Sequence, residues 1–169
     1  MTIELAQTHQ AKKIHTLLQA CGTHMRENGI MQWNENYPLL THVESDINNG
    51  GMYCMMDDLN IAGIVVIDEN QSPEYLDVDW TFHEEPILVV HRFAVHPSYQ
   101  KAGIGKKLMD FALEHAVKND YKNIRLDAYS GNERTQKFYL NRGYQKVGEI
   151  YFPFRTEHFN CYEKNLDSV

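Results

Sequence analysis

The chain has 169 residues, of which 43% are hydrophobic and 23% charged, as is typical of one globular domain with a sizeable core. Its formal net charge of −7 argues against a nucleic-acid partner, because nucleic-acid binding draws mainly on basic patches. No apolar stretch approaches the roughly 18 residues that a membrane span needs, so no membrane association is expected.

The N-terminal residues show neither the basic nor the apolar segment of an export signal. The three cysteines, Cys21, Cys54 and Cys161, are widely spaced, and an odd number of dispersed thiols favours reduced, buried side chains. We therefore expect a cytoplasmic protein. No group of His, Cys and carboxylate residues has metal-ligand spacing, so no metal site is expected.

Apolar periodicity predicts eleven secondary-structure elements, with a polar insertion over residues 68–84 that receives no assignment. In chain order they are a strand at 2–6, helices at 11–25 and 38–48, hairpin strands at 51–56 and 61–67 joined by a turn at 57–60, a strand at 87–95, a helix at 103–119, a strand at 124–129, a helix at 132–142, and strands at 144–152 and 158–164. This order implies an α/β (α+β) fold, a mixed central sheet flanked by helices, in a single domain over residues 1–169.

A glycine-spaced turn separates the strand at 87–95 from the following helix. Pro97 ends the strand, and Gly103 and Gly105 allow consecutive backbone N–H groups to point at one spot. The helix dipole adds partial positive charge there, which suits a phosphate. Lys106 and Lys107 lie in the first helical turn, where the dipole disfavours cations, and they make more sense beside a polyanionic ligand. A plain structural turn is the alternative.

The spacing Gln-x-x-Gly-x-Gly from Gln100 to Gly105 resembles the acetyl-CoA pyrophosphate loop of the GNAT N-acetyltransferase superfamily. The element order also resembles the GNAT fold over nearly the whole chain, most specifically from Phe93 to Tyr144. The resemblance implies acetyl-CoA as co-substrate. Its expected contacts are backbone groups of the preceding strand, the loop and one asparagine: Phe93, Ala94, Val95, Gln100, Lys101, Ala102, Gly103, Ile104, Gly105, Lys106 and Asn132.

The segment from Asn132 to Tyr144 resembles a second superfamily segment, although Thr135 stands where alanine is usual. By position, Tyr139 would be the general acid that protonates the departing CoA thiolate. A phenol is protonated at pH 7 and suits this task. The alternative is that Tyr139 packs in the core beside Phe138.

A general base would take a proton from the acceptor amine. Asp127 lies five residues before Asn132, and some superfamily members have an acidic base at that spacing; Glu85 is a rival. Either carboxylate could instead be a solvated surface group, and some members use water relays. His91 could relay a proton, but a hydrogen-bonded structural histidine is the plainer interpretation.

The acceptor is expected to be a small-molecule amine or a peptide amino end. Trp33 and Tyr37 fall in a region that borders the acceptor cleft in this superfamily, so they either wall that cleft or cap the core. With Glu85 they are the candidate substrate-binding residues. The acidic stretch from Glu74 to Glu85 is either a solvated loop or a negative rim that attracts a cationic amine.

These features favour an N-acetyltransferase that acts by direct attack of the amine in a ternary complex, as a monomer or homodimer. One alternative is a non-catalytic CoA-binding or sensory GNAT-like module, which would bind acetyl-CoA without releasing thiol. Another is an acyltransferase that uses a different acyl-CoA, such as succinyl- or propionyl-CoA.

Overall fold

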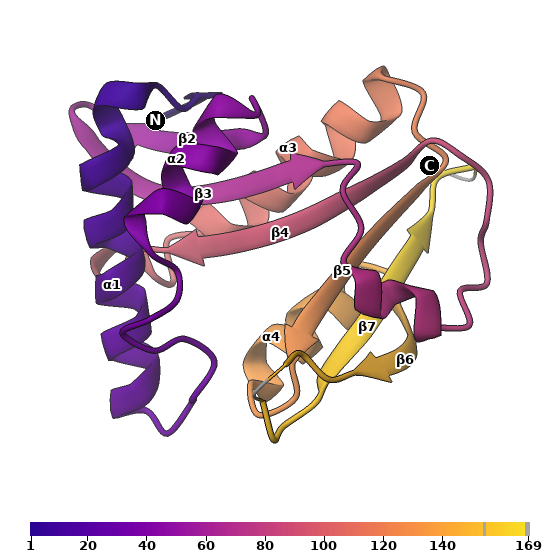
Figure 1. Cartoon of the computed structure of the whole chain (residues 1–169). Helices are drawn as coiled ribbons and strands as arrows, with labels where there is room; N and C mark the ends of the chain where they lie inside the picture. The colour runs from indigo at the N-terminus through magenta and orange to yellow at the C-terminus, as the bar shows by residue number, and fades with distance from the viewer. Residues whose placement is uncertain (154, 168–169) are drawn as a thin grey trace. The chain divides into compact units, whose positions relative to one another are not determined.

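A computed structural model describes residues 1–153 and 155–167 of the chain (Figure 1). The described residues form seven strands in one mixed sheet, in the order β1-β2-β3-β4-β5-β7-β6, and four α-helices. This is the predicted fold class. The strands are β1 Thr2–Leu5, β2 Met52–Asp57, β3 Asn60–Asp68, β4 Ile87–Val95, β5 Asn123–Tyr129, β6 Gln145–Ile150 and β7 Phe159–Asn165; the helices are α1 Ala11–Glu27, α2 Leu40–Asn48, α3 Ile104–Lys118 and α4 Glu133–Leu140.

The chain divides into two compact units. Unit 1 is Met1–Ile67 with Arg92–Ala112, and unit 2 is Asp68–His91 with Leu113–Val169. The expected single domain over residues 1–169 includes residues 154 and 168–169, which lie outside the described residues, and it stays a prediction.

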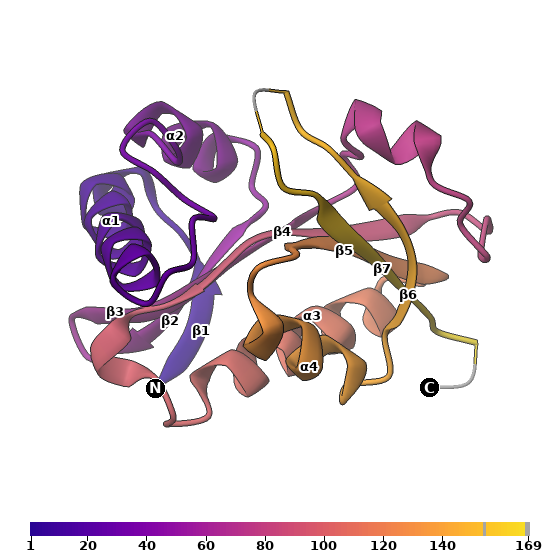
Figure 2. The same ribbon diagram turned by 90° about the horizontal axis from the view of Figure 1, so that it is seen from below.

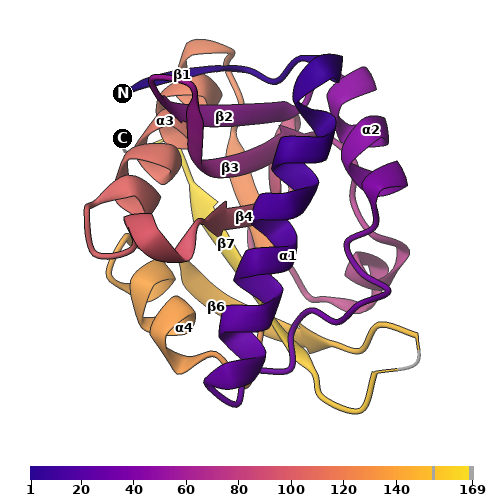
Figure 3. The same cartoon turned by 90° about the vertical axis from the view of Figure 1, so that its left-hand side faces the viewer.

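Unit 1 is built on the antiparallel pairs β1–β2 and β2–β3, with α1 and α2 lying over this part of the sheet (Figure 3). The apolar stripe of α1 explains this packing, because Ile14, Leu17 and Leu18 are buried. They join buried residues of α2, β2 and β3 in one core, which also contains Trp33 and Ala94.

The turn between β2 and β3 is tighter than the sequence indicates. Asp57 pairs with Asn60, so the turn consists of Asp58 and Leu59 rather than the predicted four residues. Asp58 has a φ of 53°, a left-handed conformation that aspartate tolerates better than most residues. The two outer residues of the predicted turn therefore belong to the strands.

The second helix begins at Leu40, two residues later than the predicted start at Pro38. Leu39 has an extended backbone (φ −84°, ψ 164°), and its N–H donates to Nδ1 of His42 at 2.9 Å. This side-chain acceptor holds Leu39 outside the helix. The other predicted elements agree with the observed ones to within two residues at each end.

Unit 2 contains the parallel pairing of β4 residues Ile87–Val90 with β5, and the antiparallel pairs β5–β7 and β6–β7 (Figure 2). Helix α4 packs beside β6 and β7, where the Tyr139 ring lies 5.8 Å from that of Tyr162. The three cysteines are buried and free, as expected.

The unassigned insertion at 68–84 is anchored through side chains to the rest of unit 2. Glu163 of β7 is fully buried, and its carboxylate accepts the N–H groups of Thr81 at 2.9 Å and Phe82 at 3.3 Å. The guanidinium of Arg125 lies over the Trp80 ring, 4.2 Å from its centroid, and donates to the Phe82 carbonyl at 2.8 Å. Such contacts order a segment whose short helical turn, Pro73–Asp77, is too brief to be stable alone.

Candidate functional site

The segment after β4 is pinned at both ends within unit 1. The Ser98 N–H donates to Nδ1 of His96 at 3.3 Å, and the Tyr99 hydroxyl donates to Oδ2 of Asp57 at 3.0 Å. Pro97 begins a single helical turn that Tyr99 ends. The chain therefore enters the glycine turn from a fixed position.

The turn itself uses two left-handed residues, Lys101 with φ 67° and Gly103 with φ 76°. A Cβ atom at Gly103 would meet no heavy atom within 4 Å, so the space above this residue is open. Helical bonding starts with the Lys107 N–H, which donates to the Gly103 carbonyl at 3.1 Å. The N–H groups of residues 103–106 thus have no acceptor within the helix. A helix start of this kind suits an anion, and the expected contact with a pyrophosphate stays a prediction.

The helix start also packs closely on β4. A Cβ atom on Gly105 would lie 3.1 Å from Cζ of Phe93, so only glycine fits without displacement of that ring. Ala94 is buried, whereas Phe93 and Val95 are half-buried. The described β4–β5 ladder ends at Val90, so the backbone of residues 93–95 lies outside it. Their expected contact with a pantetheine arm stays a prediction.

The lysines of the first helical turn are exposed. Lys106 Nζ lies 2.9 Å from Oδ2 of Asp110, a surface pair of a kind that contributes about 0–1 kcal/mol. Because this ion pair is weak, the Lys106 ammonium can exchange Asp110 for a phosphate. Lys101, Ala102 and Gln100 complete the predicted loop in one continuous segment of unit 1.

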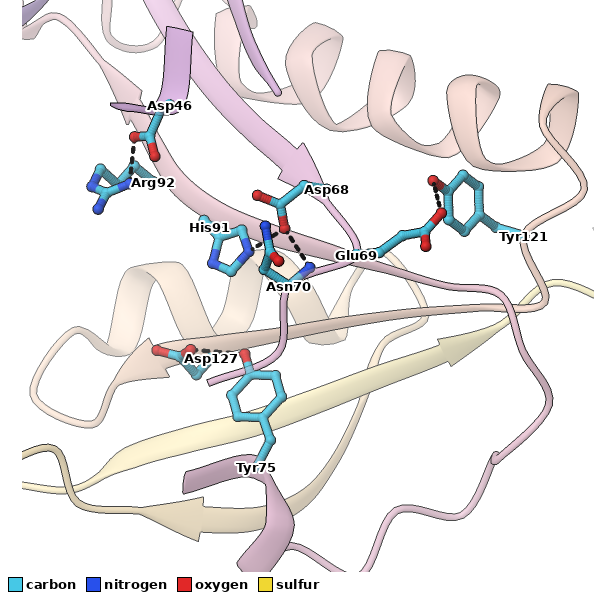
Figure 4. Close-up of polar contacts among 9 residues, drawn as sticks. All are labelled: Asp46, Asp68, Glu69, Asn70, Tyr75, His91, Arg92, Tyr121 and Asp127. Carbon is cyan, nitrogen blue, oxygen red and sulfur yellow. Dashed lines mark hydrogen bonds and ion pairs between the residues drawn. The ribbon is translucent and has the colours of Figure 1, made fainter. Parts of the chain in front are cut away.

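The predicted acceptor residues differ in exposure and belong to different units. Trp33 is 7% exposed and belongs to the core of unit 1, where its carbonyl accepts from Arg26 Nη1 at 3.0 Å. Tyr37 is exposed, and the Arg92 guanidinium lies 5.4 Å from its ring centroid. Arg92 also forms an ion pair with Asp46 (Figure 4). Glu85, in unit 2, is exposed.

Asn132 caps the start of α4 in unit 2. Its Oδ1 accepts from the Thr135 N–H at 3.2 Å, and its carbonyl accepts from the Gln136 N–H at 3.2 Å. Threonine in place of the usual alanine therefore leaves the helix start intact. The cap orients Asn132, and its proposed contact with the co-substrate stays a prediction.

Tyr139 is 4% exposed and surrounded by aromatic rings of unit 2. Its ring centroid lies 5.6 Å from that of Phe138 and 5.8 Å from those of Tyr144 and Tyr162. Burial, and then the nearby Tyr144, Asp127 and Tyr162, raise the pKa of Tyr139 far above its usual value. The phenol is therefore a proton donor at neutral pH, and core packing and acid chemistry are compatible here.

Asp127 lies on β5, opposite Cys161 of β7, and its side chain is half-buried. The hydroxyl of Tyr75 donates to its Oδ1 at 2.8 Å (Figure 4). Burial raises the pKa of Asp127 above its ordinary value, although the Tyr75 hydrogen bond and the charge of His91 oppose this. The carboxyl is thus more basic than a surface aspartate, as a general base requires.

His91 is hydrogen-bonded, as expected of a structural histidine. Its Nε2 lies 2.8 Å from Oδ1 of Asp68, which also accepts the Asn70 N–H at 2.7 Å (Figure 4). Burial by itself raises the pKa of Asp68, but the interactions with His91 and Asn70 outweigh it and lower the pKa on balance. Asp68 therefore stays ionised and fixes the His91 ring.

Tyr75 is the residue of this cluster that sequence reasoning missed. It lies in the unassigned insertion, and its partner Asp127 is 52 positions away in the sequence. The available signal was weak: an aromatic residue just after Pro73, followed by Trp80, in an otherwise polar and acidic stretch. Such residues indicate that part of the insertion packs on the protein.

The described residues contain no helix that is long and apolar enough to span a membrane. Among these same residues, no three His, Cys, Asp or Glu side chains are grouped as metal ligands would be.

Comparison with known proteins gives consistent matches. The model of the Acetyltransferase (GNAT) family matches residues 11–144. The uncharacterized N-acetyltransferase YesJ of Bacillus subtilis (strain 168) is 25% identical over 145 residues, which is 82% of this chain and 78% of YesJ. The crystal structure of a GNAT-family acetyltransferase from Streptococcus agalactiae 2603 has a TM-score of 0.86 at 20% identity, covering 98% of this chain and 95% of that one.

A GNAT-family acetyltransferase from Listeria monocytogenes 4b F2365 has a TM-score of 0.78 at 21% identity, covering 98% of this chain and 94% of that one. At these identities the two crystal structures show a shared fold. The family match spans most of the chain and includes the glycine turn, Asp127 and Tyr139. The chain belongs to the Acetyltransferase (GNAT) family.

Proposed function

We propose that this protein is an acetyl-CoA-dependent N-acetyltransferase that acetylates an amine by direct attack in a ternary complex. The observation that carries the proposal is the glycine turn. Gly103 is left-handed with open space above it, and the four N–H groups of residues 103–106 have no helical acceptors. A diphosphate fits such a turn, because backbone donors and the helix dipole both favour an anion.

The residues of unit 1 that would bind acetyl-CoA are Phe93–Val95 through their backbone and Gln100–Lys106 through the turn. In unit 2, Asn132 would donate to the arm of the co-substrate. The thioester supplies an activated acetyl group. A backbone N–H of the Phe93–Val95 segment would stabilise the oxyanion, and loss of one such donor costs about 10²–10³ in rate.

The proton transfers are assigned to two side chains of unit 2. Asp127 takes a proton from the amine as the C–N bond forms, directly or through water. Tyr139 gives a proton to the sulfur as the C–S bond breaks. The raised pKa of Asp127 supports its role as base, and the raised pKa of Tyr139 keeps this group protonated at neutral pH, so that it has a proton to give. Glu85 is the less suitable base because it is exposed.

The acceptor is proposed to be a small-molecule amine or a peptide amino end, taken up by a monomer or homodimer. Trp33, Tyr37 and Glu85 remain candidate acceptor residues, and Tyr37 and Glu85 have the exposure that direct contact needs. Three buried free thiols suit a reducing compartment, which supports a cytoplasmic location.

A thiol-release assay with acetyl-CoA tests the proposal across polyamines, aminoglycosides, amino acids and short peptides, with calorimetry of CoA binding alongside. Thiol release with one amine class and acetylated product by mass spectrometry is the expected result. CoA binding without release in any panel would favour a non-catalytic module. Faster release from succinyl- or propionyl-CoA would assign a different donor, and absence of CoA binding would refute the loop assignment.

A further inference from the structure

One side chain of the insertion between β3 and β4, that of Tyr75, contacts the proposed base Asp127. The hydroxyl of Tyr75 donates to Oδ1 of Asp127 at 2.8 Å, and both residues belong to unit 2 (Figure 4). We propose that Tyr75 is a positioning residue that holds the Asp127 carboxylate as proton acceptor for the incoming amine. This inference rests on the acetyl transfer proposed above.

The position of the Tyr75 phenol is set independently of Asp127. Tyr75 is 3% exposed, and its ring centroid lies 5.1 Å from that of Trp80. The Trp80 Nε1–H donates to the Tyr75 carbonyl at 2.9 Å, and Arg125 covers the other ring of this pair, with its guanidinium 4.2 Å from the Trp80 centroid. The donor is therefore preorganised, and it fixes the carboxylate rather than following it.

The hydrogen bond leaves one carboxylate oxygen for chemistry. Tyr75 occupies Oδ1, whereas none of residues 1–153 and 155–167 donates to Oδ2 of Asp127. In the same part of the chain, the buried side-chain oxygens and nitrogens that lack a hydrogen-bond partner do not include Oδ2 of Asp127. A carboxylate held at one oxygen presents the other in a defined direction, as a proton acceptor must.

Several ionisable groups surround Asp127 and have to be separated from Tyr75 in any pH experiment. They lie on the insertion, β4, β7 and α4: Tyr75, Glu74, His91, Cys161 and Tyr139. Burial raises the pKa of Asp127, and Tyr75 and His91 lower it. Burial, and then Asp127 itself, raise the pKa of Tyr75, so Tyr75 remains a donor across the neutral range. The hydrogen bond therefore offsets part of the cost that burial imposes on the ionised carboxylate.

The test is the pH profile of kcat/KM for wild type and Tyr75→Phe, with acetyl-CoA and an amine that the release assay has identified. Loss of the donor should move the acidic limb upward by about one pH unit, the size expected for a hydrogen bond to a charged group. Affinity for CoA should stay unchanged. An acidic limb at the wild-type position would overturn the inference.

Tyr121→Phe is the matched control. Tyr121 also donates its hydroxyl to a carboxylate of the insertion, Oε1 of Glu69 at 2.9 Å, but at an exposed position (Figure 4). This variant loses a similar anchor and should keep the wild-type limb. If Tyr121→Phe shifts the limb as much as Tyr75→Phe does, the effect belongs to the anchoring of the insertion, and the inference fails.

A measurement that needs no turnover separates this inference from the proposed function. Carbon-13 NMR of the Asp127 carboxyl, assigned with Asp127→Asn, should show an upward shift of its titration in Tyr75→Phe. An unchanged titration in an active enzyme would overturn the role of Tyr75 alone. If the Asp127 titration shifts as expected but no amine gives thiol release, acetyl transfer is overturned. The positioning of the Asp127 carboxylate by Tyr75 then still holds.

If Tyr75→Phe does not fold, 3-fluorotyrosine at position 75 keeps the shape and strengthens the donor. The acidic limb should then move downward, because a stronger hydrogen bond favours the ionised carboxylate. A limb that stays at the wild-type position in this protein would overturn the inference.

Discussion

Gly63 of β3 lies so close to Ala94 of β4 that a Cβ atom on Gly63 would stand 2.8 Å from the Ala94 carbonyl oxygen. The same atom would lie 3.0 Å from Cδ1 of Leu108 and 3.2 Å from Cγ2 of Ile104 in α3. The absence of a side chain at this position therefore brings together the strand and the helix that flank the glycine turn.

Gly63→Ala should destabilise the protein by about 1–3 kcal/mol, since backbone and two buried side chains must move. Urea unfolding measures the change. Gly22→Ala is the control: its Cβ would meet chiefly the flexible end of Arg26 at 3.3 Å, and alanine is favoured over glycine within a helix by about 0.5–1 kcal/mol. Equal effects of the two substitutions would contradict the close approach at Gly63.

Gly103→Glu should abolish acetyl-CoA binding in calorimetry, because it places bulk and negative charge beside the proposed diphosphate site. Gly29→Glu is a closely matched control in unit 1. Gly29 has a φ of 77°, against 76° for Gly103, and both would place a Cβ atom in open space. Both variants therefore incur the same backbone strain, about 1–2 kcal/mol. Loss of affinity in both would point to misfolding rather than to the anion site.

Tyr139→Phe should lower kcat by roughly 10²-fold and leave the affinity for acetyl-CoA similar, in line with the usual contribution of a general acid. The ring contacts with Phe138 and Tyr162 are retained, so the fold is kept. Tyr144→Phe, which also removes a buried hydroxyl from this aromatic cluster, should keep most of the turnover. Equal turnover of wild type and Tyr139→Phe would move the acid to another residue.

Asp127→Asn should abolish most of the activity and yet stabilise the fold at pH 7. Burial raises the pKa of Asp127 in the folded protein, so the folded state binds this proton more tightly than the unfolded chain does. The resulting stabilisation is present below the unfolded pKa and is lost as the pH rises through the folded pKa. Asparagine does not ionise, so the variant keeps this stability at neutral pH, and its side-chain oxygen can still accept from the Tyr75 hydroxyl.

Thermal unfolding of wild type and Asp127→Asn at several pH values checks whether the substitution raises the stability. The gain in stability of the asparagine variant over wild type should be largest at neutral pH and shrink as the pH falls through the folded pKa of Asp127, where the wild-type carboxyl takes up its proton. A variant that is less stable than wild type at pH 7 would contradict the burial of the charge. Stability gained together with activity lost is typical of a functional carboxylate.

The order of elements and the glycine turn could be predicted because their signals are local. A stripe of apolar residues defines α1, and Pro97, Gly103 and Gly105 specify a strand end, a left-handed residue and a close contact within a few positions. The start of α2 was misplaced because one side-chain acceptor, His42, decided it.

Spacing along the chain was enough to predict the family, the sheet class and the place of the glycine turn. Three placements follow from the folded chain alone: Trp33 lies in the core, the Glu163 carboxylate binds the N–H groups of Thr81 and Phe82, and the Tyr75 hydroxyl donates to Asp127. These outcomes depend on which distant segments the fold packs against one another. A buried polar group takes its partner from whatever the fold brings near it, and local sequence does not encode that choice.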